Sequence, residues 1–419
     1  MPVTARIATG AVLLAACMAS AGTAGSLTLI PIPHGLEGHV FNTGVSGDGK
    51  VATGYAPGGS FYWTAETGVV YNGGLEPGWH GCGGDCKISE DGTRMCGQFL
   101  DDSSHAIGGY YLLPEGVWVT QASMGSNCDI TKVSAWNISR DGRVLVGLGY
   151  PTFCGVRPSR WVDGDSATVP LYTWFGWQSR VDAVSRDGRV MCGWQAIATG
   201  WWQGAAWLPN AAGTGWVQYR LADAAGHPMG EAMACSGDGA WVFGRGDFGD
   251  GVQNPYRWSL ATGAMQLGAG MSGMYVTGAN ADGSMAAVSP QGPFPSGDGK
   301  LWIQGRGAVA LRTYAAEHGF AVPADVHLGM LMDISPDGLA FCGVGSNSTD
   351  GYDYTFVLDL HPAAAPCTAD LDANHVVDGA DLGMLLGNWG GQGTGDLDGN
   401  GTVDGADLGA MLGAFGPCP

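Results

Sequence analysis

The chain has 419 residues and a formal net charge of −20, with only 13% charged residues and 74 glycines. An acidic chain without a basic stripe repels nucleic-acid phosphates and anionic membrane surfaces, which excludes nucleic acid as a partner. The glycines follow no collagen period, and together with the few charges they indicate an all-β protein with many tight turns.

The first 25 residues have the pattern of a bacterial export signal. Arg6 precedes an apolar run over residues 7–16, and small residues follow it. The pattern predicts a secreted or extracellular protein, with cleavage before Gly22. A second interpretation stays open, because residues 14–17, Leu-Ala-Ala-Cys, resemble a lipobox in which Cys17 is acylated and anchors the protein. No later run of about 18 apolar residues occurs, so we expect no transmembrane segment.

A repeated Ser-x-Asp-Gly motif organises residues 45–360. A glycine follows six residues after the aspartate in six of the seven copies, and a Trp, Tyr or Val lies twenty residues after it in copies two to seven. Asp-Gly between apolar runs is a strong hairpin signal, because the turn needs a positive φ. The intervals between copies range from 43 to 55 residues. The repeated aspartates are Asp48, Asp91, Asp141, Asp187, Asp238, Asp282 and Asp337.

Each repeat is long enough for four short strands. A sheet of this size cannot bury its two faces by itself. Seven such sheets arranged radially would pack on one another, so we predict a seven-bladed β-propeller with four-stranded blades over residues 26–361. Residues 362–366 are expected to be a short linker. The repeat resembles extracellular proteins with HAF-type repeats, although His-Ala-Phe itself is absent from the third strands. That resemblance implies the propeller fold and no particular reaction.

The last repeat lacks material for a fourth strand before the proline-rich linker. At the other end of the chain, residues 26–31 form an extra strand-like segment before the first Asp-Gly turn. An unpaired blade edge would be an aggregation hazard. We therefore predict that residues 27–30 pair with residues 354–360 as the outermost strand of the seventh blade.

Residues 370–381 and 396–407 are two twelve-residue segments with oxygen-bearing side chains at positions 1, 3, 5, 9 and 12. With a backbone carbonyl at position 7, such a set surrounds one Ca²⁺ ion. The apolar residue at position 8, Val377 or Val403, would pack each loop against a core. Helices are expected to follow over residues 382–389 and 408–415. We predict a small α-helical module with two EF-hand-like calcium loops over residues 367–419.

The duplicated loop and helix, with Asp rather than Glu at position 12, resemble the type I dockerin module. The resemblance implies a cohesin-like or other extracellular protein as partner. Dockerins recognise cohesins at and just after loop positions 10 and 11, but here both pairs are Gly-Ala. His375 replaces the usual glycine of the first loop, so we expect that site to be the weaker one. The implied ligands are Asp370, Asp372, Asn374, Val376 (carbonyl), Asp378 and Asp381 in the first site, and Asp396, Asp398, Asn400, Thr402 (carbonyl), Asp404 and Asp407 in the second.

The eleven cysteines fall into groups with different expected roles. Cys367 and Cys418 bracket the predicted calcium module, so we predict a disulfide between them. Cys82 and Cys86 are close enough in sequence to pair locally. The cysteines that share one repeat position, and are therefore expected to be small buried core residues, are Cys96, Cys192 and Cys342.

The sequence contains no hydrolase nucleophile motif, His-Glu-x-x-His zinc motif or phosphate-binding loop. It favours a secreted, non-enzymatic calcium-binding protein that acts as an extracellular binding module for carbohydrate or protein. The alternative is a polysaccharide-active enzyme, a glycoside hydrolase or lyase, which a facing Asp/Glu pair at the central mouth would favour. The aromatic residues that would stack on sugars, or else pack between blades as most such residues do, are Tyr172, Trp174, Phe175, Trp177, Trp201 and Trp202.

Overall fold

The computed structural model describes residues 25–32, 41–56, 59–73, 85–100, 106–124, 133–150, 155–173, 178–290, 298–349, 353–362, 367–374 and 376–418. The predicted export signal with Cys17, and most of the predicted linker, lie outside these residues. The chain divides into two compact units between His361 and Pro362. Among the described residues, no helix has the length and apolar character needed to cross a membrane.

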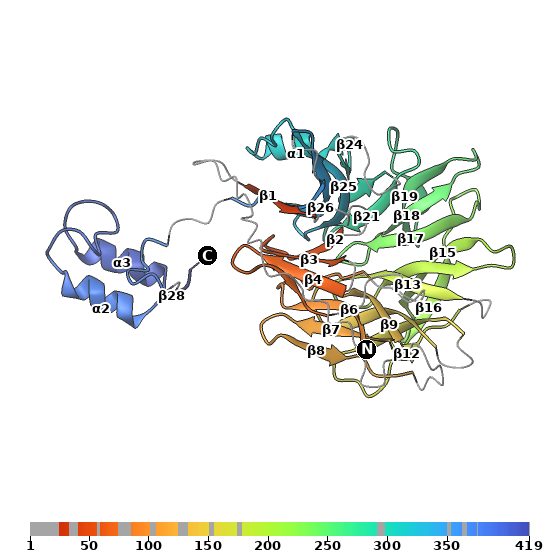
Figure 1. Ribbon diagram of the computed structural model, residues 1–419, viewed down its shortest axis with the longest axis horizontal. Helices are drawn as coiled ribbons and strands as arrows, with labels where there is room; N and C mark the ends of the chain where they lie inside the picture. The colour runs from red at the N-terminus through yellow and green to blue at the C-terminus, as the bar shows by residue number, and fades with distance from the viewer. Residues whose placement is uncertain are drawn as a thin grey trace, which may run out of the picture. The chain divides into compact units, whose positions relative to one another are not determined.

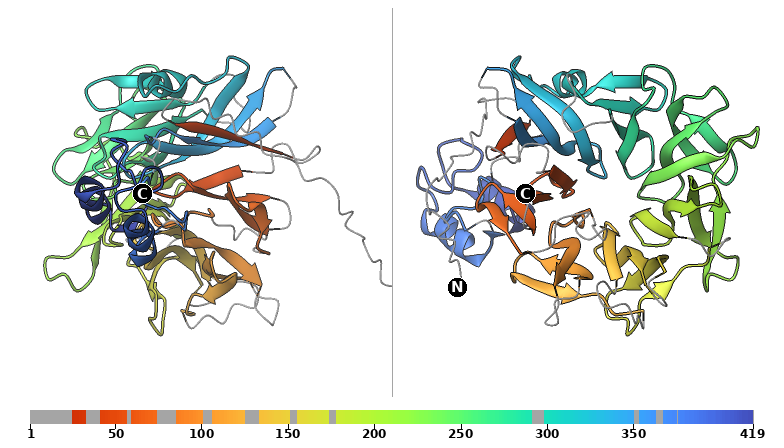
Figure 2. Two further views of the ribbon diagram at one scale, coloured as in Figure 1. Left: turned by 90° about the vertical axis from the view of Figure 1, so that its left-hand side faces the viewer. Right: turned by 45° about the vertical axis from the view of Figure 1, so that its right-hand side comes forward.

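The first unit is a seven-bladed β-propeller built of antiparallel sheets (Figure 1). Six blades have four strands in one sheet, and in the second blade Ile88 bridges to Met95 beside a three-stranded sheet. The right-hand view of Figure 2 shows the blades arranged radially around a central axis. The predicted fold class is confirmed.

The strands of each blade run outward from the axis in chain order, with one exception in the last blade. Blade 1 has β2 (Phe41–Val45), β3 (Val51–Ala56), β4 (Gly59–Thr64) and β5 (Gly68–Tyr71); blade 2 has β6 (Arg94–Leu100), β7 (Ala106–Leu112) and β8 (Val117–Thr120); blade 3 has β9 (Val133–Ile138), β10 (Val144–Gly149), β11 (Arg157–Val162) and β12 (Val169–Pro170); blade 4 has β13 (Ser179–Val184), β14 (Met191–Ala196), β15 (Trp202–Pro209) and β16 (Trp216–Arg220). Blade 5 has β17 (Met229–Cys235), β18 (Val242–Asp247), β19 (Gln253–Ser259) and β20 (Gly263–Gln266); blade 6 has β21 (Tyr275–Ala279), β22 (Met285–Ser289), β23 (Lys300–Ile303) and β24 (Gly307–Ala310); blade 7 has β25 (Val326–Ile334), β26 (Ala340–Asn347), β27 (Asp353–Asp359) and β1 (Ser26–Pro31). A short helix, α1 (Leu311–Glu317), connects blades 6 and 7.

The Ser-x-Asp-Gly motif forms the turn between the first two strands of each blade. In the six copies that have serine, its hydroxyl donates to the aspartate at 2.5–2.7 Å. The same hydroxyl accepts from the backbone N–H five residues on, as Ser185 does from Val190. The turn glycines have φ between +69° and +79°, which other residues rarely adopt. The aspartates are therefore turn formers, as such positions usually require.

The glycine six residues after each aspartate is explained by a close approach of two strands. A Cβ on Gly193 would overlap the carbonyl oxygen of Arg180, and one on Gly343 would overlap that of Met330. Irregular pairing of the first two strands occurs at the same level, between Val181 and Ala183 for example. The repeat glycine therefore lets the irregular innermost strand lie close against the second strand.

Backbone hydrogen bonds connect successive Asp-Gly turns around the axis. The N–H of Gly47 donates to Glu90 at 2.7 Å, and the N–H of Glu90 donates to Arg140 at 2.7 Å. The same kind of contact continues through blades 4 to 7, and ends with Ala281 donating to Pro336 at 2.8 Å. The turns therefore form a chain of hydrogen bonds that fixes the angle between neighbouring blades.

The predicted closure of the ring is confirmed. β1 pairs with β27 in antiparallel register, from Ser26 opposite Asp359 to Pro31 opposite Tyr354, and it is the outermost strand of blade 7. In Figure 1, β1 from the N-terminal end lies beside the strands of the last blade. Leu27 packs in the core next to blade 6, whereas Ile30 packs in the core next to blade 1. One strand thus contributes to both interfaces of the last blade.

The repeat-register tryptophans and cysteines lie in the cores between blades, as expected. Trp207 is fully buried, and its indole N–H donates to the carbonyl of Tyr172. The buried thiols at the shared repeat position are those of Cys96, Cys192 and Cys342. Cys86 is also a buried free thiol, while its expected partner Cys82 lies outside the described residues.

His361 ties the end of the last blade to the Asp-Gly turn of that blade. Its Nδ1 lies 2.5 Å from an oxygen of Asp359, and its Nε2 lies 2.7 Å from an oxygen of Asp337. Burial of the imidazole disfavours its charged form, but the two carboxylates outweigh burial and raise the pKa of His361. The propeller should therefore be stabilised by protonation of this residue.

Because the folded-state pKa lies above the ordinary value of 6.5, this stabilisation is complete below that value and is lost as the pH rises through the folded-state pKa. We predict that wild type exceeds His361→Gln in Tm most at about pH 5, and that the difference shrinks toward about pH 9. Thermal unfolding at constant ionic strength measures this difference in Tm at each pH. A difference that grows with pH would contradict the prediction.

Candidate functional site

The second unit contains two helices, and each begins inside a predicted loop, three residues before its predicted start, because the aspartate at loop position 9 caps it. The elements are β28 (Val376–Val377), α2 (Gly379–Gly387), α3 (Gly405–Gly413) and β29 (Gly416–Pro417). Val377 and Val403 are fully buried in its core, as predicted for position 8. The predicted disulfide between Cys367 and Cys418 is confirmed, with an S–S distance of 2.04 Å.

The aspartate at position 12 of each loop is buried and holds the loop against its helix. Asp381 accepts from the backbone N–H groups of Leu371 at 2.7 Å and Asp378 at 2.8 Å. These N–H groups, that of Asp378 most of all, lower the pKa of Asp381. Asp407 makes the equivalent bonds to Leu397 and Asp404 in the second loop, and its pKa is lowered in the same way. Both carboxylates are therefore ionised at neutral pH.

Three carboxylates converge in each loop. Oxygens of Asp370, Asp372 and Asp381 lie within 4.8 Å of one another, and those of Asp396, Asp398 and Asp407 do the same. The chain has no Lys or Arg after residue 367, so no lysine or arginine of this unit neutralises them. Like charges at this spacing repel one another in the absence of a bound cation. Hard oxygen ligands of this kind suit Ca²⁺ or Mg²⁺.

The remaining predicted ligands have defined roles in the same loops. Asp378 and Asp404 are the N-cap residues of α2 and α3, each in a reciprocal capping box with the position-12 aspartate. The side-chain oxygens of Asn374 and Asn400 accept from the backbone N–H groups of Val376 and Thr402, at 2.8 and 2.9 Å. His375, the expected weak point of the first loop, lies outside the described residues.

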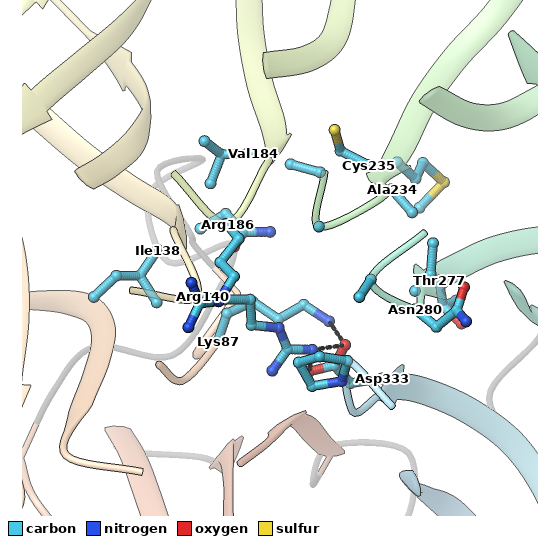
Figure 3. A pocket seen from close by; sticks show the side chains of 18 of the residues that line it. Lys87, Ile138, Arg140, Val184, Arg186, Ala234, Cys235, Thr277, Asn280 and Asp333 are labelled. Atoms are coloured by element: carbon cyan, nitrogen blue, oxygen red, sulfur yellow. Dashed lines mark hydrogen bonds and ion pairs between the residues drawn. The ribbon is translucent and has the colours of Figure 1, made fainter. Parts of the chain in front are cut away.

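The axis of the propeller is closed at the Asp-Gly end by a charged cluster (Figure 3). The guanidinium of Arg140 crosses to Asp333 at 3.0 Å, and it also donates to the carbonyl oxygens of Val45 and Ile334. Lys87 lies 3.8 Å from Asp333 on another side. The cavity that remains has a volume of about 50 Å³, enough for one or two water molecules. Side chains therefore leave little open space at this end of the axis.

A second charged cluster lies nearer the other end of the axis, on the innermost strands of blades 4 and 5. Arg180 contacts Asp182, and it donates to Glu231 at 3.0 Å. Its guanidinium also lies 3.6 Å from the ring centre of Trp136. Burial raises the pKa of Asp182 well above its ordinary value, against the opposing effect of Arg180. The carboxylates of Asp182 and Glu231 are the Asp/Glu pair that the enzyme alternative requires, but Arg180 lies between them.

Only some of the aromatic residues considered for sugar stacking lie among the described residues. Trp202 begins β15 and Trp201 directly precedes it; both are exposed, as is Tyr172. Trp174, Phe175 and Trp177 lie outside the described residues. The axial charges were not predicted, although their positions in the repeat carry a signal. Arg180 and Glu231 both lie seven residues before the turn aspartate of their repeat, where apolar residues would be expected in a buried strand.

The fold is similar to solved structures of β-propellers. Oligogalacturonate lyase in complex with manganese matches with 12% identity over 82% of this chain and 95% of that chain, with a TM-score of 0.51. The β-propeller domain of the Trilobed protease from Pyrococcus furiosus (10% identity, 77% and 93% coverage, TM-score 0.48) and a putative TolB from Agrobacterium tumefaciens (15%, 54% and 80%, TM-score 0.39) also match. These likenesses concern the fold alone. No protein-family model and no curated protein matches the chain.

Arg140 and Arg186 offer a matched test of the axial cluster, because both occupy the variable position of Ser-x-Asp-Gly. Arg140→Ala should lower the free energy of unfolding by about 3 kcal/mol, because the Asp333 carboxylate, only 6% exposed, loses its main partner. Arg186→Ala should cost at most about 0.5 kcal/mol, because Arg186 pairs with Glu90 at the surface and is 58% exposed. Urea unfolding measures both. Equal losses would show that the cluster does not hold the axis.

Proposed function

We propose that this chain is an exported calcium-binding protein whose propeller acts as an extracellular binding module. The observation that carries the calcium part is the convergence of three carboxylates in each of two duplicated loops, in a unit that has no Lys or Arg after residue 367. Two of the three aspartates in each loop begin the loop, and the third begins the following helix. A divalent cation would therefore connect loop and helix.

Each proposed Ca²⁺ ion would take five side chains and one backbone carbonyl as ligands. The side chains at positions 1, 3 and 12 already converge, while those at positions 5 and 9 lie in the same loop. The ligands of the first site would be Asp370, Asp372, Asn374, Val376, Asp378 and Asp381. Those of the second would be Asp396, Asp398, Asn400, Thr402, Asp404 and Asp407.

The helices of the second unit offer a surface for an extracellular protein partner of the cohesin-like kind. Leu386 in the last turn of α2 and Trp389 just after it are exposed, and so are Leu412 in α3 and Phe415 just after it. The two pairs are 26 residues apart and occupy equivalent positions in the duplicated motif. Exposed apolar residues at equivalent positions of a duplicated motif favour a surface that contacts another protein.

Binding, rather than catalysis, is the function that we propose for the propeller. Arg180 ion-pairs with both Asp182 and Glu231, which is how structural charges are satisfied in an interior. One observation keeps a polysaccharide-active enzyme as the second candidate. The pKa of Asp182 is raised by burial, and a carboxyl with a raised pKa beside a second carboxylate is the arrangement used by glycosidases.

The calcium proposal predicts two ions per chain in isothermal titration of chelator-treated protein. Asp372→Asn and Asp398→Asn should each weaken one site by about tenfold or more and leave the other, since each removes a ligand charge. These aspartates are exposed, so the variants should still fold. Glu66→Gln, an exposed carboxylate of blade 1, is the matched control and should bind like wild type. Absence of calcium binding by wild type, or an unchanged stoichiometry and affinity in both variants, would refute the proposal.

A further inference from the structure

The end of the propeller opposite the Asp-Gly turns has a large cleft between blades 4 and 5. Its volume is about 790 Å³, within the range of about 300–1,000 Å³ that is usual for ligand sites. It is formed by the β14–β15 connection, the start of β17 and the β18–β19 connection. The residues used below are Trp201, Trp202, Glu231, Arg245, Asp247 and Gln253, all of which line it.

One wall of the cleft is a rigid aromatic platform. The Trp202 ring stacks on Trp194 with 4.4 Å between ring centres and 11° between planes. Trp194 is 5% exposed while Trp202 is 50% exposed, so one face of the outer indole is covered and the other is open. The guanidinium of Arg180 lies 5.6 Å from the Trp194 ring and 3.6 Å from that of Trp136. The stack thus reaches from the axis to the cleft, and fixes the platform before a ligand arrives.

Trp201 is a second exposed indole that lines the cleft. It is 70% exposed, although large aromatic side chains are usually buried. The tight turn before it is held by backbone bonds between Ile197 and Trp201 at 3.0 Å and between Gly200 and Ile197 at 2.8 Å. Two adjacent exposed indoles on an ordered turn indicate a surface that is covered when a ligand binds.

The polar groups of the cleft suit hydroxyl groups rather than a charged ligand. Glu231 is anchored by Arg180 and supplies acceptors, while Arg245 lies 3.7 Å over the Tyr275 ring and supplies donors. Asp247 accepts from three backbone N–H groups of its own turn, at 2.8–3.0 Å. With two carboxylates and one guanidinium, the lining has no positive excess that would attract an anionic ligand.

We propose that this cleft binds a neutral carbohydrate chain. A pyranose ring would lie against the open face of Trp202, and its hydroxyls would bond to Glu231, Arg245 and Gln253. The volume accommodates an oligosaccharide segment rather than one sugar. This assignment rests on the proposed extracellular binding function and names its ligand class. It does not depend on the calcium loops.

Affinity electrophoresis of the full chain tests the assignment, in native gels that contain soluble mixed-linkage β-glucan, xylan, glucomannan, dextran or polygalacturonate. Wild type should be retarded by at least one of the four neutral polymers and not by polygalacturonate alone. Trp202→Ala should lose at least about tenfold in affinity for that polymer, because stacking on a fixed ring is removed. Trp202→Phe, which keeps a smaller ring, should retain part of it. Tyr71→Ala removes an aromatic side chain of similar exposure, 58%, from blade 1 and should bind like wild type.

Each other outcome overturns a defined part of the account. Retardation of wild type in no neutral gel, or in polygalacturonate only, overturns the neutral carbohydrate ligand. Equal retardation of wild type and Trp202→Ala overturns the cleft, and leaves a carbohydrate-binding function elsewhere on the chain. An unchanged Tm of the Trp202→Ala protein would show that its loss of binding does not come from unfolding. Calcium titration of the same samples reports separately on the proposed metal sites.

Discussion

The pairing of β1 with β27 is the contact on which the ring depends. It joins segments such as those of Ile30 and Thr355, which are 325 positions apart in the chain. Leu27 and Ile30 place their side chains in different cores, so this one strand supports both interfaces of blade 7. Without it, blade 7 would have three strands and an open edge, and the hydrogen-bonded series of Asp-Gly turns would end without support.

The two ends of the closed ring differ in how much space they leave around the axis. At the Asp-Gly end, Arg140 reaches across the axis to Asp333, and the space that remains is only about 50 Å³. At the other end, the connections between the second and third strands of blades 4 and 5, together with the start of β17, leave a cleft of about 790 Å³. The charged and aromatic stack around Arg180 connects this cleft to the axis. The ligand surface is therefore expected on the side away from the repeated turns.

The sequence predicts what local chemistry determines, and little beyond it. Asp-Gly turns, the ring closure and the Cys367–Cys418 disulfide follow from turn chemistry, strand counting and position, and all are present. Arg140 and Arg186 hold the same motif position and line the same cavity, yet Arg140 is mostly buried against Asp333 whereas Arg186 is 58% exposed and pairs with Glu90. The stacking of Trp194 on Trp202 likewise depends on strand register. Such differences arise from three-dimensional packing, which a repeat in one dimension does not encode.

The most direct test of the closure is hydrogen–deuterium exchange of the intact chain. If β1 is the fourth strand of blade 7, peptides that cover Ser26–Pro31 and Asp353–Asp359 should exchange on the slow timescale of β26, because their amides share one hydrogen-bonded sheet. Exchange of the β1 peptide within seconds, while the strands of blades 2 to 6 stay protected, would contradict the account of how this propeller is closed.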